Sequence, residues 1–382
     1  MTETRRLYYE DVYKKEFTAK VLECREAKKG FHIILNESAF YPEGGGQPSD
    51  IGYLGDVKVK EVHEKDGELL HYTDKPLEAG TEVQGRINWA RRFDLMQQHS
   101  GEHMVSGLIH EAYGYDNVGF HMGSDTITVD LNGPLDETQL AEIEQKTNEK
   151  IWEDTEVKIL YPTAEELEKI DYRSKKELTG QVRIVEFPGV DICACCAPHV
   201  DRTWEIGNIK LVDMVSYKGG ERITMLSGSR ALTDHQQKEE SVKKISALLC
   251  AKDTEVAEAV EKLKEEQLDL KNQVSALKQK LLAYQAKEID VTPELVKVFD
   301  SELSGNEPRE LMNILLERGA KICAIFAGND EEGYRYVIGS HSEDVKVISK
   351  KLNEAFQGRG GGKPQMVQGS LKGTAKNISE IL

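Results

Sequence analysis

Two histidines and a glutamate stand close together in the segment QQHSGEHMVSGLIH. His99 and His103 are four residues apart, so on a helix both side chains project from one face and can reach one metal ion at about 2.0–2.1 Å. With Glu102 they spell H-x-x-E-H, the order of the inverted zinc-protease signature, in which the glutamate is a base. The spacing suits a protease, another zinc enzyme or a helix that merely carries two histidines, and only further ligands can decide.

A second group of metal-binding residue types lies in the segment DICACCAPHV. Cys195 and His199 form a C-x-x-x-H pair, and a tight turn at Pro198 could direct both side chains to one point. If the turn needs three residues between ligands, Cys195 fits, because Cys196 would leave two residues and Cys193 five. Two helix ligands and two loop ligands make a tetrahedral zinc set. We therefore expect one zinc ion held by His99, His103, Cys195 and His199. The alternative is that the cysteines belong to the core at a strand end.

The composition excludes several classes of protein. A chain of 382 residues is long enough for two or three domains, and it contains no apolar run near the roughly 18 residues that span a bilayer. The first residues, MTETRRLYYEDVYKKEF, have no apolar secretory core, so we expect a soluble, cytoplasmic protein. The net charge of -17 argues against broad nonspecific binding to nucleic acid but allows a local basic site.

The distribution of the cysteines favours a metal over disulfides. Three of the six crowd into the DICACCAPHV segment, and in a reducing compartment such clustering indicates metal binding. Cys24, Cys250 and Cys323 are scattered, as structural thiols usually are.

The pattern of apolar residues along the chain predicts the helices and strands that position these residues, and together they indicate an α+β fold. The first ninety residues alternate short β-like runs with turn residues, whereas Leu95, Met104 and Leu108 take helical spacing in a helix that stops at Gly114. After it, strand-like and amphipathic helical segments alternate. We expect a β-barrel-like domain in 1–90, an α+β zinc domain in 91–230, a helical or coiled-coil segment in 231–289 and an α/β domain in 290–382.

Apolar residues follow a 4-3 heptad rhythm from Val256 to Tyr284, and Gln267 fills the one polar slot. This pattern predicts a coiled-coil helix. Its partner is either a second helix of the same chain, in an antiparallel hairpin, or a second chain, in a dimer. The last segment reads as helix, strand (KICAIFAG), strand (GYRYVIGS), helix (DVKVISKKLNEAF) and then a glycine loop, QGRGGGKPQMVQGS.

Three separated motifs resemble one family. HSGEHMVSGL followed by RIVEFPGVDICACCAPHVDRTWEIGNIKLV resembles the editing domain shared by alanyl-tRNA synthetases and the free-standing, AlaX-like alanyl-tRNA editing proteins. SAFYPEGGGQPSDIGYLG is similar to the amino-terminal motif of that family, and GRGGGKPQMVQGS to the C-terminal, DHHA1-like domain that the synthetases share with DHH-type phosphoesterases. Because the first glycine motif arrives by residue 40, we expect no aminoacylation domain ahead of it, and the large free-standing form is the expected match.

Two departures from the family pattern stand out. The family often has C-G-G-T-H where this chain has C-C-A-P-H, so the loop before His199 lacks two glycines and could be stiffer. Synthetases often carry a small hydroxyl residue or alanine where this chain has Gly101 and Glu102, which fits a subfamily difference.

The resemblance implies a zinc-dependent hydrolase that cleaves the ester of serine, or of glycine, attached by mistake to tRNA(Ala). An alanine pocket cannot strongly exclude an analogue with one added hydroxyl or one methyl fewer, so a second, hydrolytic site is required. Zinc could activate water, polarise the ester carbonyl or anchor the substrate. Four protein ligands leave no free tetrahedral position, so either the coordination expands or one ligand is loose.

The same reading assigns further candidate residues. Glu102 is a candidate base or amino-group ligand; the alternative is a solvated carboxylate that only supports a metal ligand. The glycine motif allows close approach of a ribose or phosphate and offers an amide for hydrogen bonding. Its substrate-binding candidates are Gly44, Gly45, Gly46 and Gln47. Arg91 and Arg92 could meet phosphate, although ordinary surface charge is the expected role.

Because the net charge is acidic, tRNA binding requires a locally basic site, here called the tRNA grip, and the C-terminal glycine loop is the candidate. Backbone N–H groups of such a loop can cradle a phosphate while two cations attract it. The expected tRNA-binding residues are Arg359, Gly360, Gly361, Gly362 and Lys363. A helix of some thirty residues, roughly 45 Å long, would separate this grip from the zinc site. The alternative is that the C-terminal domain serves only dimerisation.

Two other functions are weighed against the editing esterase. A metalloprotease would need a distal glutamate ligand and would explain none of the glycine motifs. A non-catalytic tRNA-binding or assembly protein with structural zinc is the second alternative.

Overall fold

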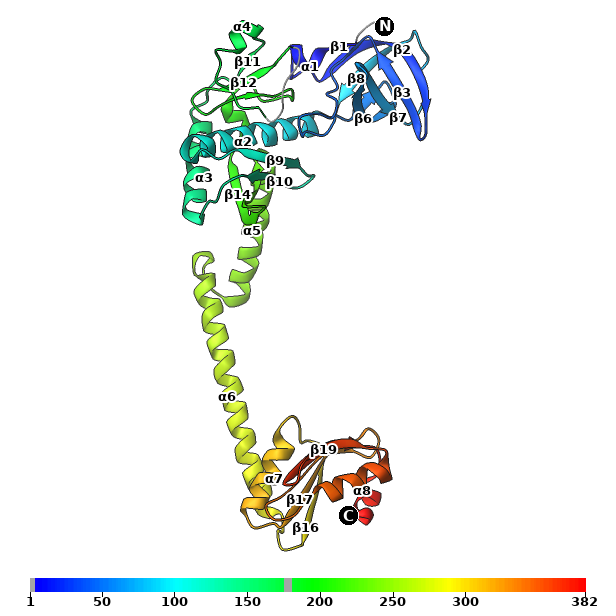
Figure 1. Ribbon diagram of the computed structural model, residues 1–382, viewed down its shortest axis with the longest axis vertical. Helices are drawn as coiled ribbons and strands as arrows, with labels where there is room; N and C mark the ends of the chain where they lie inside the picture. The colour runs from blue at the N-terminus through cyan, green and yellow to red at the C-terminus, as the bar shows by residue number, and fades with distance from the viewer. Residues whose placement is uncertain (1–3, 175–180) are drawn as a thin grey trace. The chain divides into compact units, whose positions relative to one another are not determined.

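The computed structural model describes residues 4–174 and 181–382, which divide into two compact units, Met1–Lys243 and Lys244–Leu382. Helices and strands are mixed in both units (Figure 1), which confirms the α+β class. Among the residues described, no helix is both long and apolar enough to cross a bilayer.

Six strands near the N-terminus form a closed barrel in the order β2-β3-β7-β6-β5-β8. They are β2 (Glu16–Ala27), β3 (Gly30–Leu35), β5 (Gly52–Leu54), β6 (Val57–Lys65), β7 (Glu68–Thr73) and β8 (Glu82–Ile87). Inside and outside residues alternate as a strand requires: Phe17, Ala19 and Val21 of β2 are buried, and the residues between them are exposed. Beside the barrel lie β1 (Arg5–Arg6), α1 (Leu7–Glu10) and β4 (Glu37–Ser38).

The helix α2 (Trp89–Tyr113) runs through the centre of the first unit. The side chain of Asn88 caps its first turn, and Gly114 ends it with a positive φ of 70°, as the sequence predicts. Two sheets and the helix α3 (Glu137–Trp152) surround it. One sheet consists of β9 (Asn117–Met122), β10 (Ile127–Leu131), β14 (Ile209–Tyr217) and β15 (Gly220–Ser227). The other consists of β11 (Lys158–Leu160), β12 (Ile184–Phe187) and β13 (Asp191–Ala194). The unit also contains α4 (Ala164–Leu167), the 3-10 turn η1 (Thr203–Ile206) and most of α5 (Gly228–Leu249). Because these elements pack around it, α2 is buried on nearly all sides from Leu95 to Ile109.

Arg92 is wrongly predicted as surface charge. Its side chain is fully buried, and its Nε lies 2.9 Å from Oδ2 of Asp50. The guanidinium also donates to the carbonyl oxygens of Val12 and Ala39. A buried charge must be paired and hydrogen-bonded, and these contacts meet that requirement while joining the barrel to α2.

The second unit begins with the last residues of α5, which are followed by η2 (Asp253–Glu255) and the long helix α6 (Val256–Glu288). Near its end, Leu282 and Ala286 are buried against α7 (Glu307–Glu317). The heptad side chains lie on another face: Leu263, Leu270 and Leu277 are each more than half exposed. Within this unit the predicted coiled-coil seam therefore carries no covering helix among the residues described.

A five-stranded sheet with the order β16-β17-β18-β20-β19 forms the rest of the second unit. Its elements are β16 (Leu295–Asp300), β17 (Ile322–Asn329), β18 (Gly333–Ser340), β19 (Arg359–Lys363), β20 (Met366–Leu371), α8 (Lys346–Phe356) and α9 (Ala375–Ile381). One face packs on α7 and the end of α6, and the other packs on α8 and α9. The strand β16, which pairs in parallel with β17, is not among the predicted elements.

The predicted glycine loop is wrong in conformation, because its RGGGK segment is the edge strand β19, paired antiparallel with β20. Its glycines serve the packing of that strand. A Cβ at Gly360 would collide with the Tyr336 hydroxyl, and one at Gly362 would collide with the backbone of Met366. A strand bound on one edge cannot also curl its N–H groups into a cradle.

Candidate metal centre

The structure brings all four predicted zinc ligands to one place. The buried middle of α2 carries His99 and His103, whose rings stack with centroids 5.4 Å apart. The chain that leaves β13 carries Cys195 and His199 to the same point. One ligand atom from each of the four side chains lies within 4.8 Å of all the others. Helical spacing supplies one half of the site and the strand end supplies the other.

The donor set fits a zinc ion. Zn–N and Zn–S distances of about 2.1 and 2.3 Å place tetrahedral N and S donors about 3.6 Å apart. Nε2 of His99 and Sγ of Cys195 lie 3.6 Å apart. Both ring nitrogens of His199 are buried without a hydrogen-bond partner among the described residues, which a ring nitrogen avoids unless a ligand takes it up. Two or three imidazoles with a thiolate are the ligands that zinc prefers.

Each helix histidine has its own partner on the ring nitrogen that faces away from Cys195. Nδ1 of His99 lies 3.0 Å from Oε1 of Gln47, and Nδ1 of His103 lies 2.8 Å from Oδ2 of Asp191. Since an amide oxygen and a carboxylate can only accept, both histidines carry the proton on Nδ1 and leave Nε2 for the metal. Arg173 donates from Nε to the other carboxylate oxygen of Asp191 at 2.8 Å. His199 has no comparable partner in the described chain.

Burial and mutual contact shift the pKa values of His199 and Cys195 in directions that suit metal binding. Burial lowers the pKa of His199 to about 3, so its imidazole stays neutral and keeps its lone pairs. Burial alone would raise the pKa of Cys195, but its interactions with the three imidazoles lower that pKa well below its usual range. His103 differs: burial alone would lower its pKa, but its hydrogen bonds to Asp191 and to the cysteines raise that pKa well above its usual range, so zinc would have to displace a proton from this ring.

The predicted substrate-binding turn lies directly against the metal ligands. Gly44 and Gln47 exchange backbone hydrogen bonds of 3.0 and 3.1 Å, and Gly45 and Gly46 between them adopt positive φ. A Cβ at Gly45 would lie 3.9 Å from the His99 ring, and one at Gly46 would meet the ring of Phe120 at 2.8 Å. Glycine is therefore needed at both positions for the positive φ of the turn, and at Gly46 also because the Phe120 ring leaves no space for a side chain.

Gln47 has a second group to offer. Its side chain is fully buried, and while Oε1 is engaged by His99, Nε2 has no hydrogen-bond partner among the described residues. An unpaired buried amide N–H costs about 1–3 kcal/mol, so a natural site retains one where a ligand is expected to take it up.

Glu102 lies in the same helix but outside the group of four ligands. Its buried carboxylate accepts a hydrogen bond of 2.5 Å from the Ser106 hydroxyl and another from the side-chain amide of Asn117. The carboxylate is thus held by Ser106, one turn further along α2, and by Asn117 of β9. These contacts favour a supporting role for Glu102 over that of a base.

Asp191 and Arg173 are functional candidates that the sequence reasoning missed. A usable signal exists for Asp191, because Asp191, Cys193 and Cys195 alternate along β13 and its end, and residues two apart share a face of a strand. Asp191 and Cys193 also form a second potential ligand group with His103. Arg173 carries no such signal, since it is held beside β13 by backbone contacts with Ile192 and Ala194.

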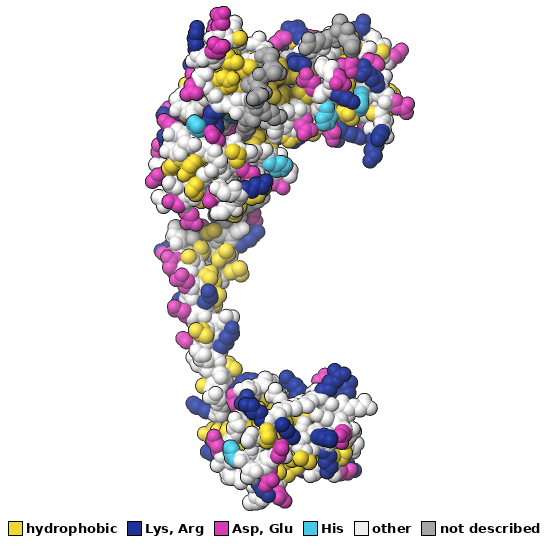
Figure 2. All heavy atoms as spheres, viewed as in Figure 1, with side chains coloured by type: hydrophobic (Ala, Val, Ile, Leu, Met, Phe, Trp, Pro, Cys, Tyr) yellow, Lys and Arg dark blue, Asp and Glu magenta, His cyan; other side chains and the backbone are white. Residues whose placement is uncertain are grey.

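The predicted tRNA-binding residues lie in the second unit, on β19. The strand register pairs Arg335 with Ser370, and Ser370 with Arg359, so both arginines stand on one face of the sheet, and Lys363 follows on that face four residues later. All three cations are exposed and take part in no ion pair within the described chain. Figure 2 shows Lys and Arg side chains on the visible surface of this unit. Arg335 is not among the predicted residues.

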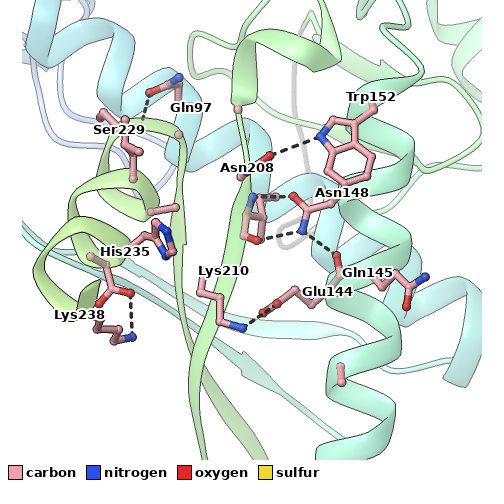
Figure 3. Close-up of a pocket in the computed structure, with 17 residues that line it drawn as sticks. Gln97, Glu144, Gln145, Asn148, Trp152, Asn208, Lys210, Ser229, His235 and Lys238 are labelled. Carbon is pink, nitrogen blue, oxygen red and sulfur yellow. Dashed lines mark hydrogen bonds and ion pairs between the residues drawn. The ribbon is translucent and has the colours of Figure 1, made fainter. Parts of the chain in front are cut away.

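A separate hollow of about 850 Å³ lies in the first unit between α3, the start of β14 and the start of α5 (Figure 3). Its charged groups pair with one another: Lys210 with Glu144, and Lys238 with Asp234, each at 2.7 Å. The exposed indole of Trp152 points its Nε1 toward Asn208. None of the metal-ligand candidates lines this hollow.

Comparison with known proteins gives a consistent assignment. The family model "tRNA synthetases class II (A)" matches residues 2–91, and "Threonyl and Alanyl tRNA synthetase second additional domain" matches residues 182–244. The alanyl-tRNA editing protein Aarsd1 of Mus musculus is 29% identical over 381 residues, with 94% of this chain and 92% of that protein covered. Aarsd1-A of Xenopus laevis is 29% identical over 390 residues, covering 97% and 93%. The alanine–tRNA ligase of Pyrococcus abyssi is 30% identical over 98% of this chain, which matches 43% of the ligase.

Proposed function

The resemblance to the alanyl-tRNA editing proteins is confirmed over nearly the whole chain, and from this premise we propose that the protein removes wrongly attached amino acids from tRNA(Ala). The reaction is hydrolysis of the ester that joins serine, or glycine, to the terminal ribose of the tRNA. It takes place in the cytoplasm, where the chain meets its tRNA substrate.

The observation that supports this proposal most directly is the arrangement around Gln47. Its glycine turn lies against the ligands His99 and Cys195, and its Nε2 is buried beside them without a partner among the described residues. An ester carbonyl brought into this space would accept from that N–H. A donor aimed at the oxygen on which charge develops is the largest single contribution in many acyl-transfer sites.

The residues divide the work as follows. Zinc, held by His99, His103, Cys195 and His199, would supply an electrophilic centre and lower the pKa of a water molecule. Asp191 and Gln47 hold the two helix histidines in the tautomer that frees Nε2. The backbone of Gly44, Gly45 and Gly46 allows the terminal ribose to approach closely. Glu102 supports α2 through Ser106 and Asn117.

For the grip on tRNA we propose the exposed sheet face of the second unit, with Arg359 and Lys363 from β19 and Arg335 from β18. Gly361, which lies between Arg359 and Lys363 on that face, has open space where a side chain would stand, so a phosphate backbone can lie close to the strand. From Ala355 to Ser379 the chain carries four basic residues and no acidic one. This local excess of positive charge allows the segment to attract tRNA although the whole chain is acidic.

The function is tested with purified protein and three esters, seryl-, glycyl- and alanyl-tRNA(Ala). We expect rapid loss of serine, glycine or both and slow loss of alanine, because the correct product must survive. Equal hydrolysis of all three would contradict a proofreading role. In parallel, Cys195→Ser should abolish stoichiometric zinc, and Cys193→Ser, the matched control two residues earlier in β13, should retain it. Loss of zinc from Cys193→Ser alone would overturn the ligand assignment.

The alternative is a non-catalytic tRNA-binding or assembly protein with structural zinc. A structural zinc site is closed by four protein ligands, and four are present here. Tight binding of tRNA(Ala) without hydrolysis of any of the three esters would establish it.

A further inference from the structure

Two segments of the first unit, 49–53 and 86–91, form a narrow strip that begins beside the glycine turn. We propose that this strip seats the unpaired 3′ end of tRNA and delivers its last nucleotide to the candidate metal centre. The inference rests on the proposed editing function, because it names the surface that would present the ester for hydrolysis.

The two segments of the strip run antiparallel and touch along their length. At one end, Nη2 of Arg91 donates to the carbonyl oxygen of Ser49 at 3.3 Å. At the other end, Tyr53 faces Arg86 where β5 pairs with β8. A backbone hydrogen bond of 2.8 Å joins the segments between these ends. At about 3.3 Å per residue, the strip is about 13 Å long from Ser49 to Tyr53, a length of a few nucleotides.

Arg91 is a half-buried cation that the described chain leaves without an anion. It forms no ion pair with the described residues, and its Nε is buried without a hydrogen-bond partner among them. The carboxylates of Asp50 and Asp94, which lie on the strip and one turn further along α2, are taken by Arg92 and Arg230 at 2.9 and 2.7 Å. Because a buried charge without a partner is costly, the free edge of this guanidinium suits a phosphate, which arginine binds bidentately.

The end of the strip that Arg91 occupies adjoins the glycine turn. Ser49 follows Gln47 by two residues, so their Cα atoms are at most about 7 Å apart. Gln47 is itself bonded to the metal-ligand candidate His99. In the last nucleotide of a tRNA, the ribose that carries the ester is linked directly to its own phosphate. With the ester beside Gln47, that phosphate falls within reach of Arg91.

The other end of the strip offers an aromatic ring between two cations. Tyr53 is 41% exposed, and the strand register places Lys58 of β6 on one side of it and Arg86 of β8 on the other. The guanidinium carbon of Arg86 lies 5.7 Å from the centroid of the Tyr53 ring. Neither cation forms an ion pair within the part of the chain that the structure describes, although Glu16 faces Arg86 across β2.

This combination favours a single strand of nucleic acid as the occupant. Surfaces that bind single strands use aromatic rings on which bases stack and cations that follow the phosphates. A duplex keeps its bases paired and stacked inside, so only an unpaired strand can lay a base on Tyr53. The 3′ end of tRNA is such a strand, and its last nucleotide carries the ester.

The strip is tested on the full chain with two uncharged RNA hairpins. One is the acceptor stem of tRNA(Ala) with its unpaired 3′ CCA, and the other lacks the CCA. We expect tighter binding of the first hairpin. Tyr53→Ala should weaken that binding about 5- to 150-fold, since stacking contributes about 1–3 kcal/mol per base, and Tyr53→Phe should preserve it. Arg91→Gln should reduce the slope of log affinity against log salt by about 0.7, the value for one phosphate of a single strand.

Lys20→Gln is the matched control, because Lys20 is an exposed lysine of the same barrel and also forms no ion pair among the described residues. Circular dichroism and zinc content establish that each variant is folded. Equal affinity of the unaltered protein for the two hairpins would overturn the proposal, as would an Arg91→Gln slope equal to that of the control. The same loss on both hairpins for Tyr53→Ala would also overturn it.

The two hairpins carry no ester, so their binding is independent of hydrolysis. A protein that prefers the CCA hairpin but hydrolyses no aminoacyl ester would contradict the editing function while supporting the strip as a binding surface. A protein that hydrolyses seryl-tRNA(Ala) but binds both hairpins equally would contradict the strip alone.

Discussion

Nδ1 of His103 lies 2.8 Å from Oδ2 of Asp191, and Arg173 holds the other oxygen of the same carboxylate at 2.8 Å. The carboxylate, buried in β13, fixes the tautomer of a metal-ligand candidate on α2 and is itself fixed. A ligand held in this way is pre-oriented before the metal arrives.

Asp191→Asn should weaken zinc binding about 10- to 100-fold, because the partner that orients His103 loses its charge. Competition with a chromophoric chelator measures the change without any activity assay. Asp201→Asn, a substitution outside the ligand groups, is the control. An unchanged zinc affinity for Asp191→Asn would show that the contact does not orient the ligand.

Two substitutions at Gln47 should separate its two roles. Gln47→Glu keeps an oxygen for Nδ1 of His99 but removes the N–H donor, so zinc should be retained while hydrolysis falls about 10²- to 10³-fold. Gln47→Leu removes both groups and should also weaken zinc binding. Zinc content and single-turnover rates with seryl-tRNA(Ala) measure the two effects. Full activity of Gln47→Glu would exclude the donor role.

Glu102→Gln should retain zinc and lose less than about tenfold in rate, because the carboxylate is engaged by Ser106 and Asn117. Loss of a general base would cost about 10²–10⁴. The rate of seryl-tRNA(Ala) hydrolysis decides between these ranges, and a loss in the larger range would assign the base to Glu102.

Arg335→Ala and Arg359→Ala should each weaken tRNA binding at low salt. Each should also reduce the slope of log affinity against log salt by about one for every phosphate that the arginine neutralises. Lys321→Ala is the matched control in the same unit, since Lys321 already pairs with Glu294 and Glu343. Filter binding over a salt series gives the slopes. Identical slopes for the control and the two arginine variants would rule out the sheet face as the grip.

The buried His71 should make the protein less stable in mild acid. Its Nδ1–H donates to the carbonyl of Ile33 and its Nε2 accepts from Ser38, and burial lowers its pKa to about 4. Between pH 6.5 and 4 the unfolded chain binds a proton that the folded chain does not, so stability falls as pH falls. The loss from this group between pH 7 and pH 5 is about 2 kcal/mol.

Denaturant unfolding at pH 7 and pH 5 measures this loss, and His71→Gln should make the difference smaller. His121→Gln, an exposed position, should leave it unchanged. An identical pH response in unaltered protein and His71→Gln would contradict the assignment.

The sequence predicts the features that depend on local spacing. His99 and His103 share a helix face because they are four residues apart, and Gly114 ends that helix as predicted. The choice of Cys195 over Cys193 also follows from spacing, and the structure places Cys195 with the three histidines. Such features need no knowledge of which distant segments meet.

The missed features all depend on contacts between distant segments. Arg92 looks like surface charge until Asp50, 42 residues earlier, is brought to it. The pairing of Gln47 with His99 spans 52 residues, and that of His103 with Asp191 spans 88. Gly360 suggests a loop by composition, but its lack of a side chain is what allows Tyr336 to lie across the strand.

The ion pair of Arg92 and Asp50 ties together two parts of the chain that look separable by sequence. Asp50 follows the glycine turn by three residues, and Arg92 precedes the first metal ligand by two helical turns. Since removing one partner of a buried pair costs about 3–5 kcal/mol, neither segment can be inherited without the other. The metal site could therefore be transplanted into another protein only if the glycine turn with Asp50 and the helix α2 with Arg92 are moved together.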